Sequence, residues 1–168
     1  MIKIGLISDT HSHLDAQILE AFKDCDEIWH AGDIGDPKVL DQLEAFKPTK
    51  SVYGNIDEAV LRHRIPEHLR FNCEGLEVWI THIGGYPGRY DKRVRSEIRS
   101  NPPNLFITGH SHILKVMPDK KLDLLHMNPG AAGHHGFHSV RTLLRFNIHE
   151  KKISQVEVIE LGRRGAIL

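Results

Sequence analysis

Short turns that carry Asp, Asn or His recur along the chain, each directly after a run of apolar residues. These turns are Asp9-Thr10-His11, Gly32-Asp33, Gly54-Asn55, Thr81-His82 and Gly109-His110-Ser111-His112. The ends of strands present side chains to a shared cleft, and carboxylate, amide and imidazole groups are ligands of divalent metals. Seven such ligands are about the number that two adjacent ions need. The pattern predicts a hydrolytic centre with two divalent metal ions.

Each turn also has an ordinary structural explanation. A carboxylate and a His two residues apart, as in Asp9 and His11, occur often by chance. Asp33 and Asn55 stand beside glycines, where Asp and Asn are favoured for backbone reasons. His82 alone fits a buried structural histidine. Five such turns at successive strand ends, however, are hard to attribute to turn statistics.

The first third of the chain alternates strand and helix. Apolar runs at Ile2–Ile7, Glu27–His30 and 50–53 predict strands. Between them, Ser12 followed by Asp15 resembles a capping box that opens one helix, and Asp36-Pro37 opens a second. This βαβαβ order implies parallel strands with right-handed crossovers.

The remaining chain is richer in strands. Further strands are expected at 69–71, 76–80, 105–108, 113–117, 122–126, 140–148 and 153–159, with a helix at 90–100. About ten strands and three helices are too many for one open sheet of this length. We therefore expect an α/β (α+β) single domain over residues 1–168, with two stacked sheets and helices outside.

Composition restricts the environment and the partners. Lys plus Arg equals Asp plus Glu, so neither nucleic acid nor an anionic membrane is an expected partner. No apolar run approaches the length that spans a bilayer. Cys25 and Cys73 form no spaced framework and are expected to be reduced, in a cytoplasmic protein. A homo-oligomer through the final hairpin and the 162–168 tail stays open.

The order D-x-H, G-D, G-N, H and G-H-x-H resembles the calcineurin-like metallophosphoesterase superfamily, and in particular its small single-domain phosphodiesterases. The Asn128-Pro129-Gly130 turn is also similar. The resemblance implies a four-layer αββα sandwich of two mixed sheets flanked by helices. It also implies a ligand set for each metal: Asp9, His11, Asp33 and His112 for one, and Asp33, Asn55, His82 and His110 for the other. This mixed N/O set suits Mn²⁺ first, and also Fe, Zn²⁺, Co²⁺ or Ni²⁺.

The expected reaction is in-line attack of a metal-bridging hydroxide on a phosphodiester, with Asp33, Asn55, His82 and Asp57 as the catalytic residues. Many phosphatases of the superfamily carry a His after the G-N Asn, where this chain has Ile56. That departure favours a small-molecule diester substrate over a monoester. Asp57 is expected to orient a metal-binding His.

Two alternatives stay open. One is a non-catalytic protein-interaction scaffold of the retromer-subunit type, which the completeness of the seven ligands disfavours. The other is a phosphomonoesterase, which Ile56 disfavours. The acid that protonates the leaving group also stays open, and the candidates are His134, His135, His138 and water.

Overall fold

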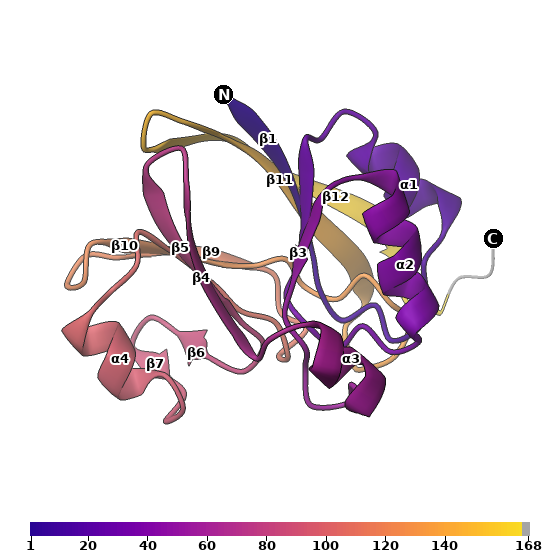
Figure 1. The fold of residues 1–168 in the computed structure, drawn as a ribbon, viewed down its shortest axis with the longest axis horizontal. Coiled ribbons are helices and arrows are strands. Elements are labelled where there is room, and N and C mark those ends of the chain that lie inside the picture. Colours follow the sequence, from indigo (N-terminus) through magenta and orange to yellow (C-terminus); the bar gives the residue numbers. More distant parts are fainter. Residues whose placement is uncertain (166–168) are drawn as a thin grey trace.

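The computed structural model describes residues 1–165 and arranges most of their strands in two five-stranded sheets (Figure 1). The first sheet has the order β12-β11-β1-β2-β3, with bounds β1 Ile2–Ile7, β2 Glu27–His30, β3 Thr49–Ser51, β11 Val140–His149 and β12 Lys152–Arg163. The second has the order β4-β5-β8-β10-β9, with bounds β4 His68–Cys73, β5 Leu76–Thr81, β8 Leu105–Ile107, β9 Lys115–Asp119 and β10 Leu124–Asn128.

Both sheets are mixed, and each contains three neighbouring strands that run in parallel. Strands β1, β2 and β3 pair in parallel, and β11 and β12 extend that sheet by antiparallel pairing. In the second sheet β5, β8 and β10 are parallel, and β4 and β9 are the antiparallel edges. Each sheet therefore sends the ends of three parallel strands to one edge, where side chains of the following loops can meet.

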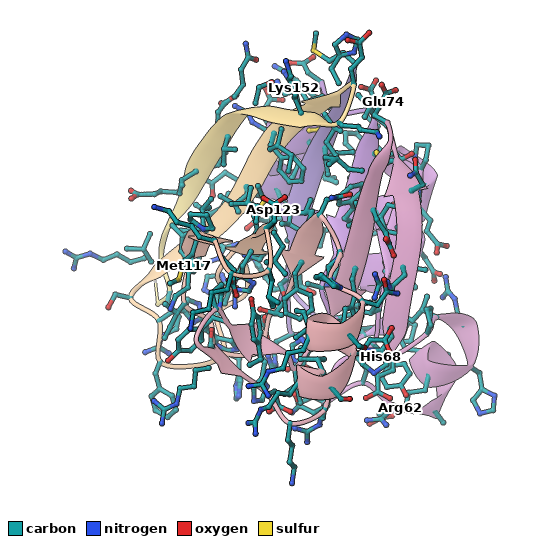
Figure 2. The ribbon with its side chains drawn as sticks, turned by 90° about the vertical axis from the view of Figure 1, so that its left-hand side faces the viewer. Arg62, His68, Glu74, Met117, Asp123 and Lys152 are labelled. Atoms are coloured by element: carbon teal, nitrogen blue, oxygen red, sulfur yellow. The ribbon has the colours of Figure 1, made fainter. Side chains whose placement is uncertain are left out.

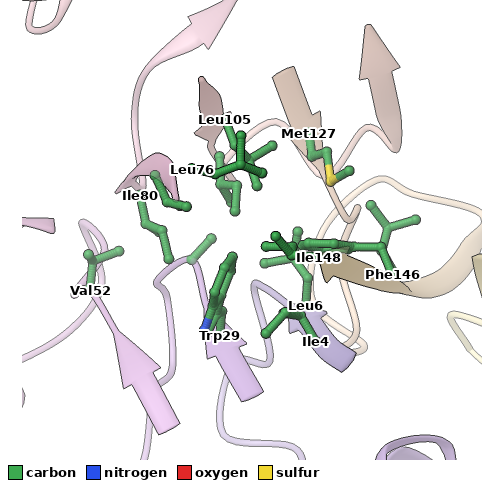
Figure 3. Packing of buried hydrophobic residues seen from close by; sticks show 14 residues of the cluster. Ile4, Leu6, Trp29, Val52, Leu76, Ile80, Leu105, Met127, Phe146 and Ile148 are labelled. Carbon is green, nitrogen blue, oxygen red and sulfur yellow. The ribbon is translucent and has the colours of Figure 1, made fainter. Parts of the chain in front are cut away.

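The main core lies between the two sheets (Figure 3). Leu6, Phe146 and Ile148 of the first sheet and Ile80 and Leu105 of the second are fully buried in it. Trp29 lies among them, with its ring edge-on to Phe71 and Phe146 at centroid distances of 5.0 and 5.9 Å. Burial of these apolar side chains holds the two sheets, and therefore their loop ends, in a fixed relation.

Helices cover the outer faces, which completes the predicted four-layer sandwich. Helices α1 (Ala16–Phe22) and α2 (Pro37–Phe46) pack on the first sheet through a second buried cluster. Helix α4 (Arg95–Ser100) packs on the second sheet, around Phe106 and Trp79. A further short helix, α3 (Ala59–Arg64), lies at the end of the sandwich (Figure 1).

One end of the sandwich carries hairpin turns, and the other carries the metal-ligand candidates. The turns of the β4–β5 and β11–β12 hairpins meet at one end, where the Lys151 amide donates to the Glu74 carbonyl at 2.9 Å. Figure 2 shows Glu74 and Lys152 at that end, with Arg62 and His68 toward the other. His82 follows β5, whose last residue, Thr81, pairs with His68, so this ligand candidate lies at the His68 end.

Several boundaries differ from those expected from sequence. Residues 89–90 form β7 (Arg89–Tyr90), paired with β6 (Gly85–Tyr86), so α4 begins at Arg95 rather than at 90. Strands β9 and β10 begin two residues later than predicted. Helix α3 was not predicted.

The start of α1 also differs, because Asp15 rather than Ser12 is the N-cap and accepts from the Ile18 amide at 3.0 Å. The Ser12 hydroxyl instead accepts from the Asp36 amide at 2.8 Å, which links the loops that follow β1 and β2. Asp36 and Pro37 open α2 as predicted.

Two further expectations concern the cysteines and the tail. Cys25 and Cys73 are both free, as expected. Within residues 1–165 there is no helix with the length and hydropathy needed to traverse a bilayer. Residues 166–168 of the tail lie outside the described residues, and pairing of the final hairpin with a second copy stays open.

Candidate metal centre

All seven candidate ligands meet at one end of the sandwich. Asp9, His11, Asp33 and Asn55 follow β1, β2 and β3 of the first sheet. His82, His110 and His112 follow β5 and β8 of the second. The site therefore spans both sheets and depends on their packing. Two groups of ligand atoms within 4.8 Å of one another result: Asp9, His11 and His112, and Asp33, His82 and His110.

Asp9 is the centre of the first group. Its Oδ1 lies 3.1 Å from Nε2 of His112 and 3.8 Å from Nε2 of His11. Its other oxygen, Oδ2, accepts from the Ser8 hydroxyl at 2.6 Å and from the His110 amide at 3.1 Å. Because Oδ2 is engaged by the protein, only Oδ1 is directed toward the imidazoles.

Asp33 lies between the two groups. Its Oδ2 is 3.4 Å from Nε2 of His11 and 3.2 Å from Nε2 of His82. Its Oδ1 accepts from the Ile56 amide at 3.1 Å. One carboxylate oxygen thus faces an imidazole from each group, which is the arrangement that a bridging ligand requires.

Hydrogen bonds also set the tautomer of His82. Its Nδ1 lies 2.7 Å from the Ala31 carbonyl, which can only accept, so Nδ1 carries the proton. The lone pair is then on Nε2 and points toward Asp33 and Asp9. At the outer side of the second group, Nδ1 of His110 lies 3.0 Å from Oδ1 of Asn55.

Three buried atoms at the centre lack a hydrogen-bond partner: Oδ1 of Asp9, Nε2 of His11 and Nε2 of His82. A buried polar atom without a partner costs about 1–3 kcal/mol, so such atoms are rarely left unused. Here they converge on one region and are all good ligands for borderline divalent metals. The residues present therefore fit a metal centre.

The charges of the centre are strongly coupled. Burial opposes ionisation of Asp9 and Asp33, but the imidazoles that face them outweigh it and lower both carboxyl pKa values. Reciprocally, the nearby carboxylates of Asp33 and Asp9 raise the pKa of His11 to about 9. The carboxylates thus hold positive charge at the place where cations would bind.

The backbone of the centre is unusual. Of the seven candidates, five adopt left-handed φ values although none is glycine: Asp9 (53°), His11 (44°), Asp33 (57°), His110 (69°) and His112 (61°). A left-handed conformation costs a non-glycine residue about 1–3 kcal/mol, and such residues cluster at functional sites. The turns are fixed by bonds between loops, such as His11 amide to Asp33 carbonyl at 3.0 Å.

Asp57 has a different role from the one expected. Its carboxylate accepts from the Gly54 amide at 2.8 Å, the Gly35 amide at 2.8 Å and the Ile34 amide at 3.2 Å, and it bonds no His. It is buried and ties the loop of Asp33 to the loop of Asn55. The prediction that Asp57 orients an imidazole is wrong, because backbone amides occupy both of its oxygens.

His30 and Ser8 also support the site, although neither belongs to the predicted set of site residues. Nδ1 of His30 accepts from the Gly32 amide at 3.1 Å, and its Nε2 lies 3.0 Å from the Thr10 hydroxyl. The loops that carry Asp9 and Asp33 are joined through this fully buried ring. For Ser8, the only sequence signal was its position next to Asp9.

The Gly-rich loop after β10 packs against the centre. The His135 ring stacks on His11 at a centroid distance of 4.7 Å, and His138 meets His112 edge-on at 5.1 Å. His134 instead contacts His13 and the Arg164 carbonyl. A Cβ on Gly136 would lie 2.2 Å from Nδ1 of His112, so only glycine permits this approach.

An open cavity of about 500 Å³ lies over the centre. Its lining includes His11, Asp33, Asn55, His110 and His112 together with His135 and His138. Three exposed apolar side chains, Ile56, Ile113 and Phe137, also line it. The arrangement offers charged ligands beneath and apolar contacts at the rim.

Comparison with known proteins agrees with this geometry. Residues 2–151 match the model of the calcineurin-like phosphoesterase superfamily domain. A probable metallophosphoesterase of Methanothermobacter thermautotrophicus is 32% identical over 138 residues, which cover 76% of each chain. A phosphodiesterase of Methanocaldococcus jannaschii is 26% identical over 145 residues, covering 77% of this chain and 83% of that one.

Solved structures share the fold. An archaeal phosphodiesterase superposes with a TM-score of 0.74 at 24% identity, covering 94% of this chain and all of the other (100%). Vps29 of Chaetomium thermophilum superposes with a TM-score of 0.75 at 13% identity, covering 96% and 97% of the two chains. The match over residues 2–151 and the relative at 32% identity show that the chain belongs to the calcineurin-like phosphoesterase superfamily.

Proposed function

We propose that the chain is a phosphodiesterase that uses two divalent metal ions. One ion would be held by Asp9, His11, Asp33 and His112, and the other by Asp33, Asn55, His82 and His110. The ligands are oxygen and imidazole nitrogen without a thiolate, a set that suits Mn²⁺, Fe, Co²⁺, Ni²⁺ or Zn²⁺, and we place Mn²⁺ first.

The observation that carries the proposal is the position of Asp33. Its Oδ2 lies within 3.4 Å of Nε2 of His11 and 3.2 Å of Nε2 of His82, while Oδ1 is bound by a backbone amide. A structural ion pair would need only one of these imidazoles. An oxygen shared between two imidazole groups, with further ligands behind each, supports two adjacent ions.

Two divalent ions at this position would supply an activated water and charge stabilisation for a phosphoryl group. The chain's own residues orient the ligands and hold the loops that carry them. Ser8 and the His110 amide fix the orientation of Asp9, and Asp57 fixes the loops of Asp33 and Asn55. The cavity of about 500 Å³ leaves room for a substituent on the phosphoryl group.

A diester is favoured over a monoester by the residue at position 56. Ile56 lines the cavity beside Asn55 and Asp33 and has no proton to donate. The leaving group of the substrate must then be stable as an anion, or it must take a proton from another group. The M. jannaschii relative described as a phosphodiesterase supports the same assignment at 26% identity.

The free cysteines support a reducing compartment, and we propose a cytoplasmic location.

The alternative is a protein-interaction scaffold, because Vps29 proteins share the fold. Metal binding does not separate the two functions, since one solved structure is a Vps29 of Entamoeba histolytica complexed with Zn²⁺, with a TM-score of 0.71 and 17% identity. Hydrolysis does separate them. A chain that binds two metals and hydrolyses no phosphodiester would support the scaffold.

The test is hydrolysis of bis-p-nitrophenyl phosphate by protein loaded with Mn²⁺, together with metal content measured by mass spectrometry. We expect about two ions per chain. Asp33→Asn and His110→Ala should each lower kcat/KM at least about 100-fold, because loss of a residue that only supports a ligand already costs 10–100-fold.

Matched controls are Asp41→Asn and His149→Ala, whose exposed side chains lie outside the centre and its cavity. Both should retain wild-type metal content and activity. If Asp33→Asn retained the activity of Asp41→Asn, the assignment of the centre would be wrong.

A further inference from the structure

A second, smaller cavity adjoins the metal centre on the outer face of the second sheet. Its volume is about 160 Å³, and its walls come from the β6–β7 hairpin, strands β9 and β10, and the loop that carries His110. His110, Ser111 and Ile113 line both this cavity and the one over the metal centre. A group bound here would therefore lie next to a phosphoryl group held at the metals.

The register of β9 and β10 places polar side chains on this face. Asn128 pairs with Lys115 and His126 pairs with Met117 across the antiparallel ladder. Side chains two residues apart share a face, so Lys115, His126 and Asn128 point the same way. The alternate residues Leu125 and Met127 face the core between the sheets.

His126 presents a hydrogen-bond acceptor to the cavity. Its ring is buried, with 1% of its surface exposed, and lines the cavity wall. Nδ1 lies 3.2 Å from the Phe106 carbonyl, which can only accept, so Nδ1 carries the proton. Nε2 then holds a lone pair and has no hydrogen-bond partner within residues 1–165. An N–H or O–H group of a ligand would donate a hydrogen bond to this nitrogen.

Lys115 presents a donor. Its Nζ lies 3.7 Å from the centroid of the Tyr86 ring, so the ammonium is held at the wall by a cation–π contact. It makes no ion pair among the described residues, which leaves its N–H groups for an acceptor on a ligand. Tyr86, Ile83 and the glycines at the start of the hairpin provide apolar surface, and Asp91, Ser111 and Asn128 add further polar groups to the lining.

The size of the cavity limits the ligand. A cavity of about 150 Å³ in another protein holds one benzene molecule, so about 160 Å³ matches one six-membered ring more closely than a fused pair. A lysine donor and a histidine acceptor favour a ring that carries an N–H donor beside a carbonyl acceptor. A pyrimidine base such as uracil has both on one edge and fits this volume better than a purine.

We propose that this cavity binds the pyrimidine base of a nucleoside phosphodiester, with His126 and Lys115 reading its donor and acceptor. The claim that the base belongs to a phosphodiester substrate rests on the proposed phosphodiesterase function. The claim that the cavity binds the base does not depend on that function.

The first experiment measures binding of nucleosides alone to metal-free protein by amide chemical shifts. Uridine should shift residues 83–86 and 126 in a saturable manner. 3-Methyluridine lacks the N–H donor and should bind at least about 5-fold more weakly, because Nε2 is then left without a partner. Adenosine should cause no saturable shift at these residues.

Variants test the same contacts. Lys115→Met should weaken uridine binding, whereas Lys121→Met, outside the cavity, should not. The comparison of uridine with its methylated form uses wild-type protein, so the test does not depend on the folding of any variant. Equal binding of uridine, 3-methyluridine and adenosine, or no binding at these residues, would overturn the proposal.

The second experiment compares kcat/KM for uridine 5′-(p-nitrophenyl phosphate) and methyl p-nitrophenyl phosphate with metal-loaded protein. The uridine diester should be preferred, and Lys115→Met should reduce that preference while Lys121→Met retains it. Saturable uridine binding without hydrolysis of either diester would contradict the proposed function and leave the cavity assignment standing. Hydrolysis of both without preference, and without uridine binding, would contradict the cavity assignment alone.

Discussion

Individual residues of the candidate metal centre use one side-chain atom to bond the protein and direct another toward the centre. Asp9 and Asp33 each give one oxygen to protein donors and direct the other inward. His82 gives Nδ1 to the Ala31 carbonyl and directs Nε2 inward. This division needs the folded loops, and it explains why residue types alone predicted the set of ligands but not the roles of Ser8 and Asp57.

The residue at position 56 is expected to control the choice between diester and monoester. Ile56 is 42% exposed and lines the cavity over the centre, so a substitution there can be accommodated. Ile56→His would place an imidazole beside Asn55, and we expect kcat/KM for p-nitrophenyl phosphate to rise about 10-fold. This is below the 10²–10⁴-fold of a well-positioned general acid, since nothing orients the new ring.

The control for that substitution is Ile56→Gln, which is of similar size and cannot act as an acid. It should leave monoester turnover at the wild-type level. An equal rise in both variants would show that side-chain polarity, and not proton donation, limits monoester turnover.

At the scale of elements, strands were predictable from sequence and loops were not. The apolar runs of β1, β2 and β5 identified the strands that the ligands follow, because a strand buried on both faces has a continuous apolar signal. The β6–β7 hairpin has only four paired residues, too few for a clear strand pattern, and only Tyr90 of it lies in the predicted helix. The cavity that it covers could therefore not be predicted.

The loops after β2 and β3 are held together by Asp57, and this contact is expected to set metal affinity. In Asp57→Asn one oxygen would be replaced by an NH₂ group facing a backbone N–H, since backbone amides engage both carboxylate oxygens. We expect Mn²⁺ affinity, measured by titration calorimetry, to fall about 10–100-fold.

Asp41→Asn serves as the control for this substitution because Asp41 is exposed. Thermal unfolding of metal-free protein separates a loss of metal affinity from a loss of fold. If Asp57→Asn bound Mn²⁺ with wild-type affinity while folded, the loops would not need Asp57 for their position.

At the scale of the whole molecule, two mixed sheets share one core and bring their loops together at one end. The first sheet supplies four of the seven candidate ligands and the second supplies three. The core around Trp29 therefore also fixes the position of the candidate ligands of one sheet relative to those of the other. The family resemblance read from the motifs predicted this four-layer arrangement, whereas the precise loop contacts depend on packing that no local pattern encodes.

Stability of the whole fold should depend on pH through the buried neutral histidines of the sandwich, of which His126 is the clearest. Burial lowers the pKa of His126 from its ordinary value of 6.5 to about 4, and the positive charge of Lys115 acts in the same direction. A histidine whose folded pKa lies below the unfolded value takes up a proton more readily when unfolded. Its contribution is complete above about pH 6.5 and is lost as the pH falls toward 4.

Between pH 7 and pH 4.5, the free energy of unfolding of His126→Gln should fall by about 2–3 kcal/mol less than that of the wild type. Urea unfolding of metal-free protein at the two pH values measures this difference, and other titrating groups cancel in the comparison. His149→Gln alters an exposed ring and should keep the wild-type dependence. If His126→Gln lost as much stability on acidification as the wild type, His126 would not be held neutral by the fold. Its Nε2 could then not be assigned as the acceptor of the second cavity.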